Sequence, residues 1–135
     1  MSRFLLDTCV ISDFIKGEPG TLHALKSCRP ADTAISAITM FEIDYGLALN
    51  PQRAKKIASL ITGLTQSIQI LPFTGATGRY AADIRAELKR KGTPIGPYDV
   101  LIAGTALEHE LTLVTANTGE FSRLEQLDLI DWRQE

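Results

Sequence analysis

Residues 96–106 read Gly96-Pro97-Tyr98-Asp99-Val100-Leu101-Ile102-Ala103-Gly104-Thr105-Ala106, a strongly apolar stretch that opens on an acid. Pro97 suits the first turn of a helix, where its missing N–H is not needed. Asp99 then falls in that same turn, where the helix dipole favours negative charge. Taken alone, Asp99 is an ordinary stabilising residue at a helix start. Its meaning depends on where the other acids of the chain lie.

Length and composition indicate a single globular domain, residues 1–135, with a core that needs no disulfide or metal for its stability. The net charge of −2 excludes a large basic surface, the usual footprint of nucleic-acid binding. Any such role must come from local basic patches or metal ions. The two cysteines, Cys9 and Cys28, form no disulfide framework, and no apolar run is long enough to span a membrane. We therefore expect a soluble, cytoplasmic protein.

Short apolar or alternating runs predict five strands, at about residues 3–6, 33–36, 67–71, 111–115 and 127–130. Helical spacing predicts helices over about 10–15, 21–28, 39–47, 51–66, 75–91 and 97–110, with a loop or single turn at 117–121. This alternation indicates an α/β fold: a three-layer α/β/α arrangement with a mainly parallel, roughly five-stranded sheet and helices on both faces.

Acidic and amide side chains follow the carboxyl ends of the predicted strands. Asp7 ends the first strand, and Glu42 lies in the first turn of the helix after the second. The helix over 97–110 should run antiparallel to the fourth strand, which brings Asp99 to the same edge. Asn117 and Glu120 directly follow that strand. Ligands of open parallel sheets bind at this edge, so four segments direct polar groups to one place.

Such a cluster of carboxylates is costly unless a cation lies among them, because like charges raise one another's pKa. An all-oxygen set without His or Cys favours Mg²⁺ or Mn²⁺. A divalent ion at this edge suits phosphodiester hydrolysis, because it binds phosphate and lowers the pKa of a bound water. For Glu42 a second interpretation stays open: Thr39 could cap its helix, with Glu42 three residues on completing a capping box.

Four ordered motifs resemble those of the PIN-domain ribonucleases, and more narrowly the VapC toxins of type II toxin–antitoxin pairs. The motifs are Leu5-Leu6-Asp7-Thr8, Ile35-Ser36-Ala37-Ile38-Thr39-Met40-Phe41-Glu42, Ile95-Gly96-Pro97-Tyr98-Asp99-Val100-Leu101-Ile102-Ala103 and Leu113-Val114-Thr115-Ala116-Asn117-Thr118-Gly119-Glu120-Phe121. The resemblance implies a PIN-like fold and a Mg²⁺- or Mn²⁺-dependent endoribonuclease. It also implies a homodimer held inactive by a VapB-type antitoxin. The last motif is most similar to the group that cuts initiator tRNA in the anticodon loop.

The resemblance assigns Asp7, Glu42 and Asp99 to metal binding and catalysis, and Thr8 to the small hydroxyl that supports the first acid. Two departures matter. Cys9 stands where the family commonly has Asn, which predicts the loss of a hydrogen bond in the site. Asn117 replaces the fourth acid. Either Asn117 or Glu120 can take that catalytic place, and Glu120 is the candidate metal ligand, directly or through water.

An RNA substrate, a tRNA by the resemblance, would need local cations to offset the net negative charge. Candidates for phosphate contacts are the basic face of helix 75–91 (Arg79, Arg85, Lys89, Arg90 and Lys91) and the group Arg53, Lys55 and Lys56. Tyr45, Tyr80 and Tyr98 are candidates for stacking on an unpaired base.

Three other functions compete with a metal-dependent nuclease. A phosphorylated receiver module would need an acid pair after the first strand, a phosphoacceptor Asp on a later strand and a nearby Lys, which this pattern lacks. A nucleotide-binding enzyme would need a phosphate loop, and no Walker A or Gly-x-Gly-x-x-Gly sequence is present. A degenerate PIN domain that binds RNA or protein without cutting stays open because of Asn117.

Overall fold

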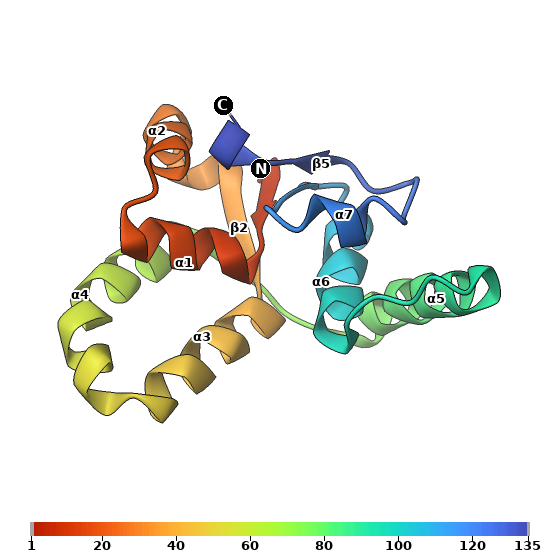
Figure 1. The fold of residues 1–135 in the computed structure, drawn as a ribbon, viewed down its shortest axis with the longest axis horizontal. Helices are drawn as coiled ribbons and strands as arrows, with labels where there is room; N and C mark the ends of the chain where they lie inside the picture. Colours follow the sequence, from red (N-terminus) through yellow and green to blue (C-terminus); the bar gives the residue numbers. More distant parts are fainter. Residues whose placement is uncertain (1, 135) are drawn as a thin grey trace.

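The computed structural model describes residues 2–134 as an α/β fold (Figure 1). Its strands are β1 Phe4–Leu6, β2 Thr33–Ser36, β3 Gln69–Leu71, β4 Thr112–Val114 and β5 Leu129–Ile130. Its α-helices are α1 Thr8–Lys16, α2 Pro19–Ser27, α3 Ala37–Leu49, α4 Pro51–Ser67, α5 Gly75–Lys91, α6 Pro97–Glu108 and α7 Thr118–Phe121. Two 3₁₀ turns, η1 Pro30–Asp32 and η2 Trp132–Gln134, complete the order. The predicted fold class is confirmed, and the segment at 117–121 is the single turn α7.

The sheet is parallel throughout, in the order β3-β2-β1-β4-β5. β1 is therefore the central strand, and Leu5 and Leu6 are both fully buried. Successive side chains of a strand point to opposite faces. Leu5 belongs to a core shared with α5, α6 and α7, whereas Leu6 belongs to a second core shared with α1 to α4. Helices thus cover both faces. Three strand-to-helix junctions, β1–α1, β2–α3 and β4–α7, lie at one edge together with the start of α6.

The α5–α6 pair is packed unusually closely, and α5 extends to one side of the body (Figure 1). A Cβ added to Gly104 of α6 would lie 2.9 Å from the backbone nitrogen of Ala81 on α5. Only glycine allows this approach without moving a helix. No helix within residues 2–134 combines the length and apolarity needed to cross a membrane.

The last turn of the chain is fastened to α1 and α2. Trp132 is buried, and its ring meets the ring of Phe4 edge-on at 5.8 Å between centroids. Both oxygens of the buried Asp13 carboxylate accept hydrogen bonds of 2.6 Å from the Arg133 guanidinium. A side chain on Gly20 would collide with the carbonyl oxygen of Trp132. This tail therefore fastens the first two helices to the end of the chain that the structure describes.

Candidate active site

Asp7 is the best-held acid of the edge. It caps α1 and is only 5% exposed, because β1 ends directly before it in the middle of the sheet. Its Oδ1 accepts a hydrogen bond of 2.8 Å from the backbone N–H of Thr8. Its Oδ2 accepts another of 2.8 Å from the hydroxyl of Thr115, a fully buried residue at the end of β4. The parallel pairing of Leu6 with Val114 brings the two residues together.

Cys9 forms hydrogen bonds in the site, although the sequence predicted the loss of one there. Its thiol donates to Oδ2 of Asp7 at 3.4 Å and accepts from the backbone N–H of Ala116 at 3.4 Å. Burial, and then the charge of Asp7, raise the pKa of this thiol, so it stays protonated and can donate. A weak hydrogen bond therefore replaces the one that an amide would make, and the expectation of a lost bond was wrong.

Glu42 points toward the site and closes no capping box. α3 begins at Ala37, two residues before the predicted start, and Ser36 caps it by accepting from the N–H of Thr39. The predicted cap at Thr39 was wrong, because the helix begins earlier and the hydroxyl of Ser36 caps its first turn. Oε1 of Glu42 instead accepts a hydrogen bond of 2.6 Å from the hydroxyl of Thr8. Thr8 thus supports the first acid through its backbone and Glu42 through its side chain.

Asp99 and Glu120 meet at the backbone of Gly96. A Cβ added to Gly96 would lie 3.2 Å from Oδ2 of Asp99 and 3.6 Å from Oε1 of Glu120. The N–H of Gly96 donates a short hydrogen bond to Oε1 of Glu120. The amide of Asn117 donates to Oε2 of the same carboxylate at 2.8 Å. Of the two candidates for the fourth position, Glu120 lies beside Asp99, and Asn117 orients Glu120.

The four carboxylates act on one another electrostatically. Burial, then the negative charges of Asp7, Glu120 and Glu42, raise the pKa of Asp99 to about 6. The pKa of Glu120 is lowered, first by the Asn117 amide and next by the N–H of Gly96. Asp99 therefore holds its proton more tightly than Glu120, and Glu120 stays ionised. An acid that is disfavoured by three other acids is typical of a functional site rather than of a folding contact.

The chemistry of these donors fits a hard divalent cation, because all are oxygens and they carry excess negative charge. Their present positions are those of carboxylates hydrogen-bonded within the chain. Within residues 2–134 no group of three or more His, Cys, Asp or Glu side chains is arranged to hold a metal ion as it stands. Ligation would require exchange of some of these internal hydrogen bonds for contacts to the ion.

Thr115 is the site residue that sequence reasoning missed. A threonine at the end of an apolar run looks like an ordinary strand former. It nevertheless donates to Asp7, and it also accepts the N–H of Asn117 at 3.0 Å. It therefore connects the first acid to the segment that carries the last one. The available indication was its position directly after β4, next to Val114, the residue that pairs with Leu6.

Comparison with known proteins gives a consistent result. The family model described as PIN domain matches residues 4–127. The chain is 36% identical over 132 residues to the tRNA(fMet)-specific endonuclease VapC of Shigella flexneri, which covers 98% of this chain and 99% of that protein.

Two solved complexes are similar in structure. One is VapBC2 from Rickettsia felis bound to a DNA fragment from its promoter, with a TM-score of 0.86 and 30% identity over 96% of this chain and 98% of that one. The other is DNA-bound VapBC from Salmonella typhimurium, with a TM-score of 0.84 and 35% identity over 98% and 99% of the two chains.

Proposed function

This chain belongs to the PIN domain family, and we propose that it is a metal-dependent endoribonuclease, the toxin of a toxin–antitoxin pair. The observation that carries the proposal is the meeting of four acids from four separate segments at one edge of the sheet. Burial and the charges of the other three acids raise the pKa of Asp99 to about 6, which indicates that the four carboxylates lie close together. Relatives named as endonucleases and ribonucleases of the VapC type support the reaction class.

In this proposal Asp7, Glu42, Asp99 and Glu120 hold Mg²⁺ or Mn²⁺, and Asn117 orients Glu120. The ion would supply Lewis-acid chemistry: it would bind the phosphate, make water a better nucleophile and offset the charge of the leaving oxygen. The chain's own part is to keep these carboxylates fixed. Thr115 and the N–H of Thr8 fix both oxygens of Asp7, and the Thr8 hydroxyl fixes Glu42.

We propose a tRNA as the substrate, with the anticodon loop of initiator tRNA favoured. Support comes from the Shigella flexneri relative, which is named as a tRNA(fMet)-specific endonuclease and is similar over nearly the full length of both chains. An exposed loop also suits the geometry, because the acids lie at an open edge of the sheet where an unpaired strand can enter.

A VapB-type antitoxin is the proposed protein partner, as in the solved VapBC complexes. A groove of about 140 Å³ between α1, α3 and α4 supports this. It has isoleucine walls, including Ile11, Ile43 and Ile57, and it ends at Thr8 and Glu42. An amphipathic segment laid into such a groove would bury its apolar face and cover Glu42 at the same time.

A homodimer is proposed from the family and from an exposed apolar stripe on α3. Phe41, Tyr45 and Leu49 follow one another at four-residue steps and are 49%, 59% and 67% exposed. Tyr98 of α6 joins them, with its ring 5.6 Å from that of Phe41. Such a stripe on a soluble domain marks a protein interface. Light scattering should report a dimer for the unmodified protein and a monomer for Leu49→Lys.

The decisive experiment incubates the purified protein with total tRNA and Mg²⁺, beside a sample with EDTA and beside Asp7→Asn. We expect cleavage only by the unmodified protein with metal, with initiator tRNA cut before the other tRNAs. Cleavage that survives EDTA or the substitution would overturn the metal-dependent assignment. If the unmodified protein binds tRNA but never cuts it, the degenerate PIN domain that the sequence left open becomes the better account.

A further inference from the structure

A groove of about 750 Å³ runs between α5 and the segment 94–101. Its floor is apolar and includes Ala81, Leu88 and Val100, and Phe73 forms part of its wall. Its volume lies within the usual range for sites that take a small organic molecule. It is therefore large enough for a nucleobase and its sugar.

The groove borders the edge that carries the acids. Ile95 and Pro97 line it, and between them lies Gly96, whose N–H holds Glu120. Asp99 is two residues beyond Pro97 in the first turn of α6. A strand of RNA with one phosphate at the carboxylates would have its next nucleotide within reach of this groove.

The rim of the groove carries two cations and no acid. Arg85 and Lys89 lie one turn apart on α5, are exposed, and form no ion pair with any residue in 2–134. Unpaired cations beside an apolar surface are suited to a ligand that combines a flat ring with negative charge.

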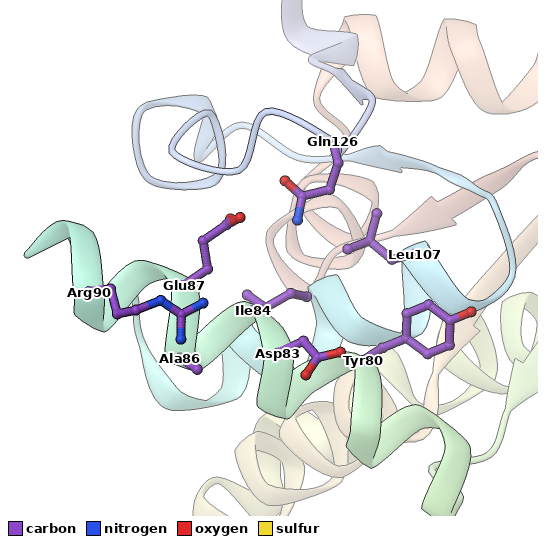
Figure 2. A pocket seen from close by; sticks show the side chains of 8 residues that line it. All are labelled: Tyr80, Asp83, Ile84, Ala86, Glu87, Arg90, Leu107 and Gln126. Atoms are coloured by element: carbon purple, nitrogen blue, oxygen red, sulfur yellow. The ribbon is translucent and has the colours of Figure 1, made fainter.

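The opposite flank of α5 is different. There a cavity of about 430 Å³ has Asp83 and Glu87 beside Arg90 (Figure 2). Lys91, one residue on, pairs with Glu87 at 3.9 Å. The two flanks of α5 thus carry similar numbers of cations. On the flank of the smaller cavity, acids neutralise these cations, whereas the cations that line the groove have no acid beside them in the described part of the chain.

Phe73 supplies the aromatic surface. It is 38% exposed and lies over Gly78, where even an added Cβ would stay 3.8 Å from the ring. An accessible ring combined with nearby cations is the chemistry by which proteins hold single-stranded nucleic acid without reading its sequence.

We propose that this groove, defined by Phe73, Arg85 and Lys89, binds an unpaired nucleotide of the RNA next to the scissile phosphate. The base lies on Phe73 and the apolar floor, and the flanking phosphates meet Arg85 and Lys89. The inference rests on the proposed ribonuclease function and adds to it a subsite on a single strand. Its residues position the substrate and take no part in the bond-breaking step.

The test measures RNA binding in the Asp7→Asn background, so that no cleavage intervenes. The probes are a fluorescein-labelled RNA hairpin with an unpaired loop and a blunt RNA duplex of equal length. The variant is Arg85→Gln with Lys89→Gln, and the matched control is Arg90→Gln with Lys91→Gln, which removes the same charge from the same helix. Phe73→Leu removes the ring and keeps the apolar surface.

We expect the groove variant to weaken hairpin binding about tenfold. We also expect it to lower the slope of log affinity against log salt by about 1.4, the value for two phosphate contacts on a single strand. The control pair should change both quantities far less, and Phe73→Leu should weaken the hairpin but not the duplex. In the cleaving protein the groove variant should raise KM more than it lowers kcat.

Equal losses in the two double variants would overturn the groove as a subsite and leave the ribonuclease proposal intact. A groove variant that keeps its RNA affinity but changes its mass in light scattering would show an interface between copies instead. If neither probe binds any form of the protein and the unmodified chain cuts no RNA, the ribonuclease proposal fails as well.

Discussion

Asp13 and Asp99 are both aspartates of short helical segments, yet their surroundings are opposite. Asp13 is almost completely buried, and both its oxygens accept hydrogen bonds from Arg133. The same contact raises the pKa of the Arg133 guanidinium, which keeps Arg133 charged. Asp99 is half-buried among three other acids, with no cation bound to it, and its pKa is raised to about 6. Asp13 thus has a cation within the chain, whereas Asp99 forms no ion pair with any residue in 2–134.

The difference separates a structural carboxylate from one that we propose to be functional. A buried acid with a bidentate arginine fastens two distant segments and has no need of a ligand. An acid that its neighbours disfavour costs folding free energy when it is ionised, and a proton or a bound cation can recover that cost. Substitutions at the two places should therefore have opposite effects on stability and unequal effects on activity.

The largest effect is expected from Asp99→Asn. Removing this charge should lower RNA cleavage by at least about 100-fold, because the proposed cation would lose a ligand. The metal-free protein should become more stable by on the order of 1 kcal/mol, a figure kept small because the side chain is half exposed. Urea unfolding in EDTA and a cleavage assay measure the two quantities. Asp44→Asn, an exposed acid of the same α3–α6 region, is the control and should change neither.

On the other side of the comparison, Arg133→Gln should destabilise the protein by about 2 kcal/mol, because it leaves the buried Asp13 without a cation. Asp13→Asn should cost less, since the exposed guanidinium of Arg133 can turn to water. Thermal unfolding of the two variants gives their order. If Asp13→Asn destabilised the protein more than Arg133→Gln, then Arg133 would not be needed to neutralise a buried charge on Asp13. The contrast with Asp99 would then disappear.

A smaller effect is expected where an acid of the site is held by a hydroxyl. Thr115→Val removes the donor to Oδ2 of Asp7 and should reduce cleavage about tenfold, the loss of one hydrogen bond to a charged group. Thr105→Val is the matched control, because Thr105 is equally buried but its hydroxyl donates to the carbonyl of Leu101, one turn earlier in its own helix. The control should alter unfolding and leave cleavage unchanged. Equal cleavage by both variants would contradict the role of Thr115.

The smallest effect concerns pH in the absence of metal. The pKa of Asp99 is about 6 in the folded protein and near its ordinary 3.8 in the unfolded chain, so the folded state binds the proton more tightly. The resulting stability is fully present below about pH 4 and is lost as pH rises through about 6. Subtracting the unfolding curve of Asp99→Asn should isolate a loss on the order of 1 kcal/mol after screening. If the difference in unfolding free energy between the two proteins does not change from about pH 4 to about pH 7, Asp99 does not feel the charges of the cluster.

The sequence predicted the sheet and the acids because both depend on local pattern. Apolar runs located the strands, and parallel topology alone was enough to collect Asp7, Glu42, Asp99 and Glu120 at one edge. The start of α3 was misplaced by two residues, because Ser36 and Thr39 are equally good caps when only propensity is considered. The geometry at Gly96 then distinguishes Glu120 from Asn117, which spacing alone did not.

Contacts between distant residues were beyond the sequence. Nothing in the pattern connects Asp13 with Arg133, 120 positions away, or Thr115 with Asp7, 108 positions away. The exchange of Asn for Cys9 looked like a loss because a thiol is a weak donor. Its bond to Asp7 depends on the fold, which places the thiol within reach of that carboxylate, and burial raises the pKa of the thiol further.

The central position of β1 has a consequence for the order of events during synthesis. β1 leaves the ribosome before it has any strand to pair with, because its partners β2 and β4 lie about 30 and 110 residues later in the chain. Contacts of such separation form late in folding. Asp7 can gain its bond to Thr115 only after most of the chain has been made. The growing polypeptide thus carries its first acid long before it carries a working site.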